Sequence, residues 1–148
     1  MRIDVRPAMP ADMSRCAQIL NDWIDETNWM PRIYSREDVE RHYREEVWFE
    51  RDTVVADCHG CVNGYVTTDR KEFVTALYVK SGSRSEGIGK LLLQEAKQKL
   101  SPRIQLYTFQ ANTGAQAFYR REGFVEISRT DGDNEERLPD ILLEWRAI

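Results

Sequence analysis

The chain has 148 residues, a length typical of one domain of roughly 100–200 residues. Its composition, with 41% hydrophobic and 31% charged residues, excludes a disordered chain. Its formal net charge of −4 disfavours a broad nucleic-acid or anionic-membrane surface. No apolar run approaches the roughly 18 residues of a membrane span and no apolar signal core follows Met1, so we expect a soluble, cytoplasmic protein that binds neither nucleic acid nor membrane.

The first third of the chain predicts a strand and two helices. Residues 2–6 are a short strand candidate. Apolar residues recur at helical spacing over residues 10–27, and the helix breaks before Pro31. Ser35 precedes acidic residues and is typical of an N-cap, so a second helix is expected over 36–47.

The remaining elements follow from composition and spacing. Three stretches rich in β-branched and aromatic residues, separated by turn signals, predict an antiparallel meander over 53–57, 61–68 and 72–80. The chain continues with a helix that includes Ile88, Leu91, Leu92, Ala96 and Leu100 and a strand over 104–109. A helix over 112–122 that ends at Gly123 and strands over 124–129 and 141–146 complete it. The order β-α-α-β-β-β-α-β-α-β-β indicates an α/β domain of the α+β type.

Cys58 and Cys61 have the spacing of a CxxC motif. A redox CxxC normally begins a helix, whereas this one falls between two expected strands with His-Gly as the turn. A zinc site needs a second ligand pair, and the spacing of Cys16 and His42 does not supply one. We therefore interpret the two cysteines as hairpin residues and predict no metal site.

The segment from Arg84 to Lys90 contains two glycines and links a strand to an amphipathic helix. Glycines let the backbone approach a ligand, and the free N–H groups of the first helical turn bind anions. The segment therefore predicts either a pyrophosphate site or an ordinary strand-to-helix turn. The spacing excludes a P-loop, because Ile88 follows Gly87, and a dinucleotide fingerprint, because Leu92 replaces its last glycine.

A second segment favours the pyrophosphate interpretation. At about 3.6 residues per turn, Asn112, Ala115 and Tyr119 fall on one face of the expected helix, and the small residue lets a ligand pass close to it.

Together these segments resemble the GCN5-related N-acetyltransferase (GNAT) superfamily. The family's first signature matches Arg84, Gly87 and Gly89. Its second signature matches Asn112, Ala115, Phe118, Tyr119, Gly123 and Phe124, and Arg6-Pro7-Ala8 with Asp12 is similar to the family's opening. The resemblance implies one domain over residues 1–148, helices on both faces of a mostly antiparallel sheet, and a V-shaped splay between the fourth and fifth strands.

The resemblance also implies the ligand, acetyl-CoA or another short acyl-CoA. Its pyrophosphate would bind the amides of residues 84–89, its pantetheine arm would pair with the fourth strand, and a backbone N–H near Tyr78 would stabilise the oxyanion. The residues that would contact it are Leu77, Tyr78, Val79, Arg84, Ser85, Glu86, Gly87, Ile88, Gly89, Lys90, Asn112, Ala115, Phe118 and Tyr119.

The implied activity is acetyl transfer to a primary amine of a small molecule, amino acid or peptide, by direct attack in a ternary complex. Tyr119 would be the general acid, since a phenol is protonated at neutral pH. Glu72 or Asp69 would be the base, directly or through water, unless no dedicated base is needed. The alternative is a catalytically silent acyl-CoA-binding module that regulates a partner.

Acceptor-facing residues are expected in the loops around the V. Trp29 and Tyr34 lie between the first two helices, Tyr107 and Phe109 share one face of the fifth strand, and the acidic loop 131–136 would attract a cationic amine. The same residues also fit aromatic packing and a solvated hairpin loop. The resemblance is compatible with a homodimer.

Overall fold

The structure is a computed structural model, and it describes residues 2–84 and 86–148. The elements in chain order are β1 (Asp4–Pro7), the 3₁₀ turn η1 (Pro10–Asp12), α1 (Met13–Glu26), α2 (Arg36–His42), the π-helical turn η2 (Tyr43–Val47), α3 (Trp48–Glu50), β2 (Asp52–Cys58), β3 (Cys61–Thr68), β4 (Val74–Val79), α4 (Ile88–Leu100), β5 (Arg103–Phe109), α5 (Thr113–Arg121), β6 (Val125–Thr130) and β7 (Asp140–Arg146). The predicted order is confirmed, with α2, η2 and α3 forming one continuous helix.

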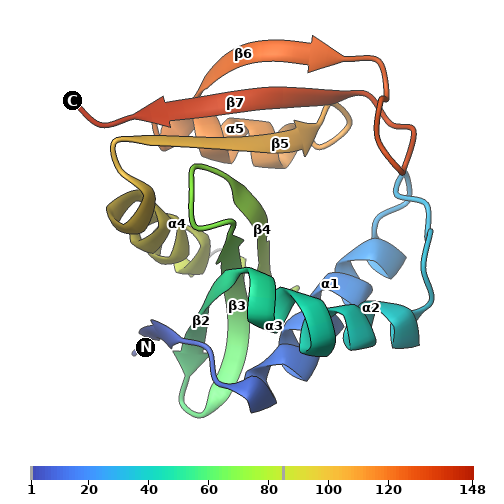
Figure 1. Ribbon diagram of the computed structural model, residues 1–148, viewed down its shortest axis with the longest axis vertical. Coiled ribbons are helices and arrows are strands. Elements are labelled where there is room, and N and C mark those ends of the chain that lie inside the picture. The colour runs from blue at the N-terminus through green and yellow to red at the C-terminus, as the bar shows by residue number, and fades with distance from the viewer. Residues whose placement is uncertain (1, 85) are drawn as a thin grey trace.

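Two antiparallel sheets form the frame of the molecule. One has the strand order β1-β2-β3-β4 and the other β5-β7-β6. They meet where Phe73 forms a parallel bridge with Gln105 and the Gln105 amide donates to the Glu72 carbonyl at 2.7 Å. From this point β4 and β5 separate, and each joins its own sheet (Figure 1). The expected V-shaped splay is therefore present.

The helices cover both faces of the β1–β4 sheet, as expected (Figure 1). Helix α4 packs on one face, in a core that includes Val54, Val66 and Leu92, while α5 lies behind β5 and β7 (Figure 1) and adds Tyr119 to the same core. Helix α1 and the α2–η2 helix pack on the opposite face, in a core that includes Met13, Cys16, Tyr43, Val55 and Tyr65. Alternate residues of each strand therefore supply the two cores.

Three details differ from the sequence-based expectation. Strand β4 begins at Val74 rather than residue 72, because the Asp69 carboxylate accepts the N–H groups of residues 71–73 and holds them in a turn. The second helix continues past Val47 to Glu50. Leu91 matches the apolar spacing of α4, yet its side chain is exposed.

Gly64 in β3 allows α4 to lie close to the sheet. A Cβ atom at this position would lie 2.8 Å from Cγ2 of Ile88 and 3.3 Å from the carbonyl oxygen of Tyr78. No real Cβ tolerates the first distance, so glycine lets the first turn of α4 rest on β3.

The hairpin interpretation of Cys58 and Cys61 is confirmed. The two residues face each other at the end of β2 and β3, with His59 and Gly60 as the turn at φ 55° and 86°. Cys58 is buried and Cys61 is exposed. Over residues 2–84 and 86–148, no His, Cys, Asp and Glu side chains are grouped so as to hold a metal ion, and no helix is long and apolar enough to cross a membrane.

An ion pair fixes the start of the chain against α1. Arg6 Nη1 lies 2.8 Å from Oδ2 of Asp12, and the same oxygen accepts the Met9 N–H at 2.8 Å. The Asp12 side chain is only 15% exposed. Its hydrogen bond from Arg6 is the main cause that lowers the Asp12 pKa below the ordinary 3.8.

This ion pair predicts a pH-dependent loss of stability in Asp12→Asn. Because the folded-state pKa of Asp12 is lowered, its contribution is fully present above about 3.8 and is lost as the pH falls through the folded pKa. We expect the variant to lose about 1–3 kcal/mol of unfolding free energy at neutral pH. Urea titrations should show this difference shrinking as the pH falls below 3.8. A pH-independent difference would contradict the assignment.

Candidate active site

The N-terminus of α4 is open to a ligand. Its N-cap is Gly87 in the left-handed region at φ 80°, and no side chain caps the helix among the described residues. The N–H groups of its first turn therefore lack acceptors within the helix and make an anion site at its positive end. Beside them, Arg84 Nε donates to the Val79 carbonyl at 3.1 Å. The predicted contact Ser85 lies outside the described residues.

Asn112 is the N-cap of α5. Its side-chain oxygen accepts the Ala115 N–H at 3.0 Å. Because this oxygen is occupied, the Asn112 side-chain nitrogen is the atom that would contact a ligand in the cleft. It has no hydrogen-bond partner among the described residues.

A cleft of about 830 Å³ lies between the ends of α4, α5 and β4, and we call it the α4–α5 cleft. It brings together most of the residues that the two sequence motifs predicted. From that set, the lining comprises Leu77, Tyr78, Val79, Arg84, Gly87, Gly89, Lys90, Asn112, Ala115, Phe118 and Tyr119.

Two predicted contacts do not line this cleft. The Ile88 side chain is fully buried in the core beneath α4, and Glu86 is exposed outside the lining. Their predicted contact with the ligand therefore stays a prediction for their backbone amides, since a helix turns only one face of side chains to the cleft.

Sequence reasoning missed four lining residues, which are Trp23, Gly114, Arg121 and Glu122. A signal for two of them was present, because Gly114 and Arg121 lie four and three residues from Phe118 and share a helix face with it. With Arg84 and Lys90, Arg121 gives the cleft three cationic side chains against the single carboxylate of Glu122.

Tyr119 lies at the inner end of the cleft. Its side chain is only 8% exposed, and its ring packs edge-on against Phe118 and Phe124 at centroid distances of 5.1 and 5.4 Å. Burial raises the pKa of Tyr119 above its ordinary value of 10.0. The hydroxyl has no hydrogen-bond partner among the described residues, so it is a protonated donor that a ligand can use.

A narrow gap of about 90 Å³ between β4 and β5 continues inward from Tyr119. Because hydrogen bonds alternate along an antiparallel pair and Lys80 donates to Asn63 of β3, the amide of Tyr78 points to β3. The amides of Leu77 and Val79 then point into the gap. An oxyanion donor near Tyr78, as predicted, would therefore be the amide of Leu77 or Val79.

A second cavity of about 700 Å³ opens on the other side of the gap, and we call it the acidic cavity. Tyr34, Tyr107 and Phe109, three of the residues predicted to face the acceptor, line it. Trp29 is not part of the lining and instead packs edge-on against Phe109 at 5.8 Å. The remaining lining residues are Leu20, Ile24, Met30, Pro31, Ile33, Asp38, Val39, His42, Tyr43, Glu46, Thr75, Tyr78, Glu135 and Glu136.

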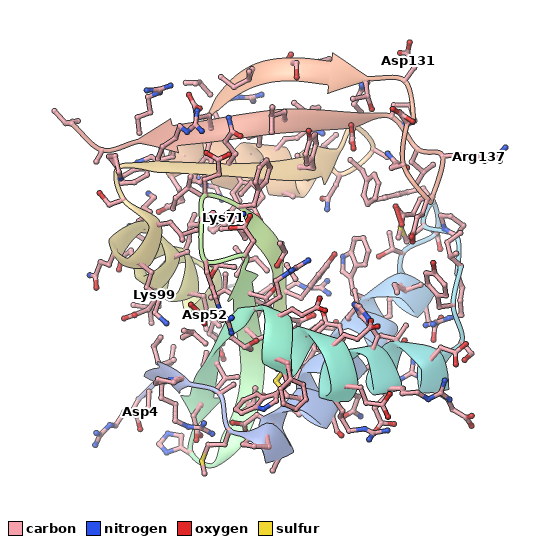
Figure 2. The ribbon with its side chains drawn as sticks, in the orientation of Figure 1. Asp4, Asp52, Lys71, Lys99, Asp131 and Arg137 are labelled. Atoms are coloured by element: carbon pink, nitrogen blue, oxygen red, sulfur yellow. The ribbon has the colours of Figure 1, made fainter. Side chains whose placement is uncertain are left out.

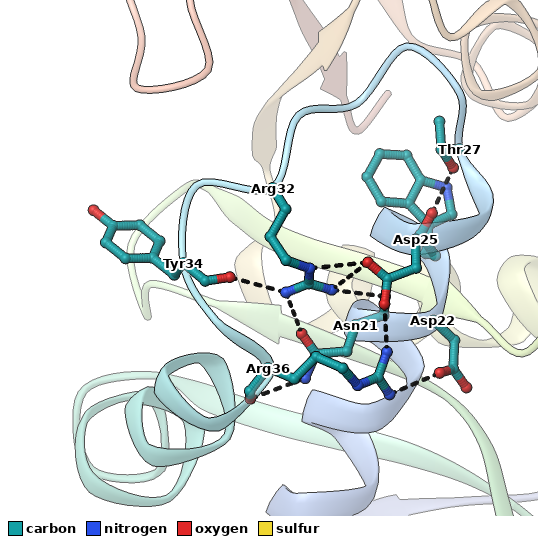
Figure 3. A network of polar contacts seen from close by, with 8 residues as sticks. Asn21, Asp22, Asp25, Thr27, Arg32, Tyr34 and Arg36 are labelled. Atoms are coloured by element: carbon teal, nitrogen blue, oxygen red, sulfur yellow. Dashed lines mark hydrogen bonds and ion pairs between the residues drawn. The ribbon is translucent and has the colours of Figure 1, made fainter.

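A polar network holds the loop that forms one wall of this cavity (Figure 3). Arg32 Nη1 donates to the Asn21 side chain at 3.0 Å and to the Tyr34 carbonyl at 2.9 Å. Asp25 pairs with both Arg32 and Arg36 at 2.8 and 2.7 Å. Bidentate and shared guanidinium contacts of this kind fix geometry, so the 27–35 loop is positioned from α1.

The two carboxylates predicted as bases lie apart from these spaces. Glu72 pairs with Arg103 where β4 and β5 meet, and it lines neither the cleft, the gap nor the acidic cavity. Burial alone would raise the pKa of Asp69, but N–H donation from residues 71–73 outweighs it and lowers that pKa. Asp69 therefore remains a charged turn residue whose Oδ1 already accepts these three hydrogen bonds.

Most of the chain matches one protein-family model. Residues 27–137 match the model described as "Acetyltransferase (GNAT) domain". The chain belongs to the GNAT acetyltransferase family. It is thus an acetyltransferase, and the α4–α5 cleft contains both of the motifs by which the sequence resembled this family.

Individual relatives agree with the family assignment. The chain is 27% identical over 146 residues to the peptidyl-lysine N-acetyltransferase YiaC of Escherichia coli (strain K12), covering 93% of this chain and 95% of that protein. Among solved structures, apo YjaB from Escherichia coli superposes with a TM-score of 0.79 at 20% identity over 100% of both chains. YncA from Salmonella typhimurium with its cofactor acetyl-CoA superposes at 0.77 and 17% identity, covering 100% of this chain and 95% of that one. These two structures share the GNAT fold.

Proposed function

We propose that this GNAT acetyltransferase uses acetyl-CoA, or another short acyl-CoA, to acetylate the primary amine of a small molecule, amino acid or peptide in a ternary complex. We also propose that residues 1–148 work as one domain. The observation that carries the proposal is the position of Tyr78, which lines the α4–α5 cleft, the gap and the acidic cavity. A donor and an acceptor in the two larger spaces would meet beside it.

The α4–α5 cleft has the chemistry to hold the donor. Diphosphate oxygens would accept from the first-turn amides of α4 and pair with Arg84, Lys90 or Arg121. The amides of Leu77 and Val79, which face the gap, would bond the extended arm in the manner of an added strand. Gly89 and Gly114 leave room for it, since neither carries a side chain into the cleft.

The reaction needs one proton donor and a positioned amine. The neutral amine forms a bond to the thioester carbonyl carbon, and the carbon–sulfur bond breaks. Tyr119 donates its proton to the departing sulfur, and the proton lost by the nitrogen leaves through water and returns to Tyr119. Positioning of the two reactants beside Tyr78 supplies the rest of the acceleration.

The relatives support both halves of the proposal. YiaC is named as an N-acetyltransferase for peptidyl-lysine, a primary amine, and YncA was solved with acetyl-CoA. The family membership of this chain extends these properties to it as hypotheses about its own donor and acceptor.

Calorimetry with CoA and acetyl-CoA, followed by thiol release across an amine panel, tests the proposal. We expect both ligands to bind the folded protein and at least one primary amine to stimulate thiol release. Binding without turnover on any amine would favour the silent acyl-CoA-binding module instead. No heat of binding for either ligand would contradict the assignment of the cleft.

A further inference from the structure

The acidic cavity differs in charge from the α4–α5 cleft. Four carboxylates line it, from Asp38, Glu46, Glu135 and Glu136, together with His42, and its described lining contains no Lys or Arg. Asp38 pairs with Arg41 and Glu46 pairs with His42. Glu135 and Glu136 form no ion pair among the described residues, so their charge is available to a ligand.

The negative charge of this loop lies in the same cavity as Tyr78, beside which transfer would occur, because Glu135, Glu136 and Tyr78 all line it. Burial is the chief cause that raises the pKa of Tyr78 to about 12, and the carboxylate of Glu136 adds to it. The nearest cation in sequence does not neutralise this loop, since the Arg137 side chain points outward from the molecule (Figure 2).

The other walls of the cavity are apolar or aromatic. Leu20, Ile24, Met30 and Val39 come from the helices and their loop, and Tyr107 and Phe109 come from β5. An aliphatic chain is stabilised by burial on such walls, and aromatic faces attract cations. The cavity therefore suits a ligand with a hydrocarbon stem and a positive end.

The mouth of the cavity favours a small ligand over a protein segment. The β6–β7 loop reaches the loop between α1 and α2 (Figure 1), where the Glu135 carboxylate beside the Tyr34 hydroxyl raises the pKa of Tyr34. A volume of about 700 Å³ also lies in the usual range for small-molecule sites, roughly 300–1,000 Å³.

We infer that the acidic cavity selects a small aliphatic amine that carries a second positive charge, and that Glu135 and Glu136 hold that second charge. The inference rests on the proposed function and narrows its acceptor to a class. One amine must be neutral to attack. A neighbouring ammonium on the same stem lowers the pKa of that amine, while the two glutamates offset the cost of binding the ammonium.

Kinetics of cadaverine and pentylamine test the inference, because these amines share a five-carbon stem and differ by one amino group. We expect the wild type to have the lower KM for cadaverine. In Glu135→Gln/Glu136→Gln, which keeps side-chain shape, we expect the cadaverine KM to rise about tenfold or more and the pentylamine and acetyl-CoA KM values to stay within about twofold. Asp131→Asn, on the same loop but outside the cavity lining, is the matched control and should change neither.

Equal KM values for the two amines in the wild type would overturn the inference, and so would an equal change of both KM values in the double variant. In either case, acetylation of pentylamine would still support the proposed function. If no amine releases thiol, calorimetry of cadaverine into the CoA-saturated protein provides a readout independent of turnover. Binding that the double variant weakens about tenfold supports the cavity assignment, and absence of binding to the wild type overturns it.

Discussion

Tyr119→Phe is expected to lower kcat about 100-fold, within the usual contribution of general acid catalysis, and to leave the Kd for acetyl-CoA nearly unchanged. The substitution removes only the hydroxyl, which has no partner among the described residues, and keeps the ring packed between Phe118 and Phe124. The buried phenol should also remain protonated in mildly alkaline solution, because its pKa is raised. The wild-type rate should therefore not fall between neutral pH and about 10 through loss of this proton.

Single-turnover measurements of product formation provide the test, because they report the chemical step. The thermal unfolding midpoint and calorimetric Kd of the variant are the controls, and both should match the wild type. An unchanged single-turnover rate would exclude Tyr119 as the acid.

The second large effect is expected from Gly114→Trp, which should weaken acetyl-CoA binding at least about 100-fold, or ~2.7 kcal/mol. Gly114 lies in the first turn of α5 and lines the α4–α5 cleft, and a Cβ there would meet no atom within 4 Å. A large side chain would therefore occupy the cleft without disturbing the core. Gly87 is less suited to this test because at φ 80° any side chain is strained.

Gly114→Ala is the matched control for this prediction. It adds the one methyl group that the open space accepts and should stabilise the helix by roughly 0.5–1 kcal/mol. Calorimetry should find near-normal acetyl-CoA affinity for the alanine variant and none measurable for the tryptophan variant. Normal affinity in a folded tryptophan variant would show that the donor binds elsewhere.

Local sequence signals predicted the frame of the cleft well. Gly87 before the apolar spacing of α4, and Asn112 before α5, each indicated a helix start within one residue of the observed one. Gly87 adopts a left-handed backbone and the Asn112 side chain caps its helix. Both effects involve only neighbouring residues, so the local sequence indicates them directly. Family resemblance then supplied the spatial relation between the two helices.

Tertiary packing decided what local signals could not. Helical spacing alone placed Leu91 with the core, yet the Leu91 side chain, in the first turn of α4, is exposed. Likewise, no local pattern indicates that the acidic 131–136 loop brings Glu135 beside Tyr34, about a hundred residues earlier in the chain. The 131–136 loop adds Glu135 and Glu136 to the cavity through this long-range contact, so the acidic lining could be proposed but not delimited.

If the donor binds in the α4–α5 cleft as proposed, the absent side chain at Gly64 links the interior of the protein to donor affinity. An atom added there would push on Ile88 or Leu92 of α4, or on the Tyr78 carbonyl of β4. Whichever yields, the spacing between the first-turn amides of α4 and β4 would change. Gly64 would then act as a fixed spacer that sets the distance available to the proposed cofactor between its phosphates and its acetyl group.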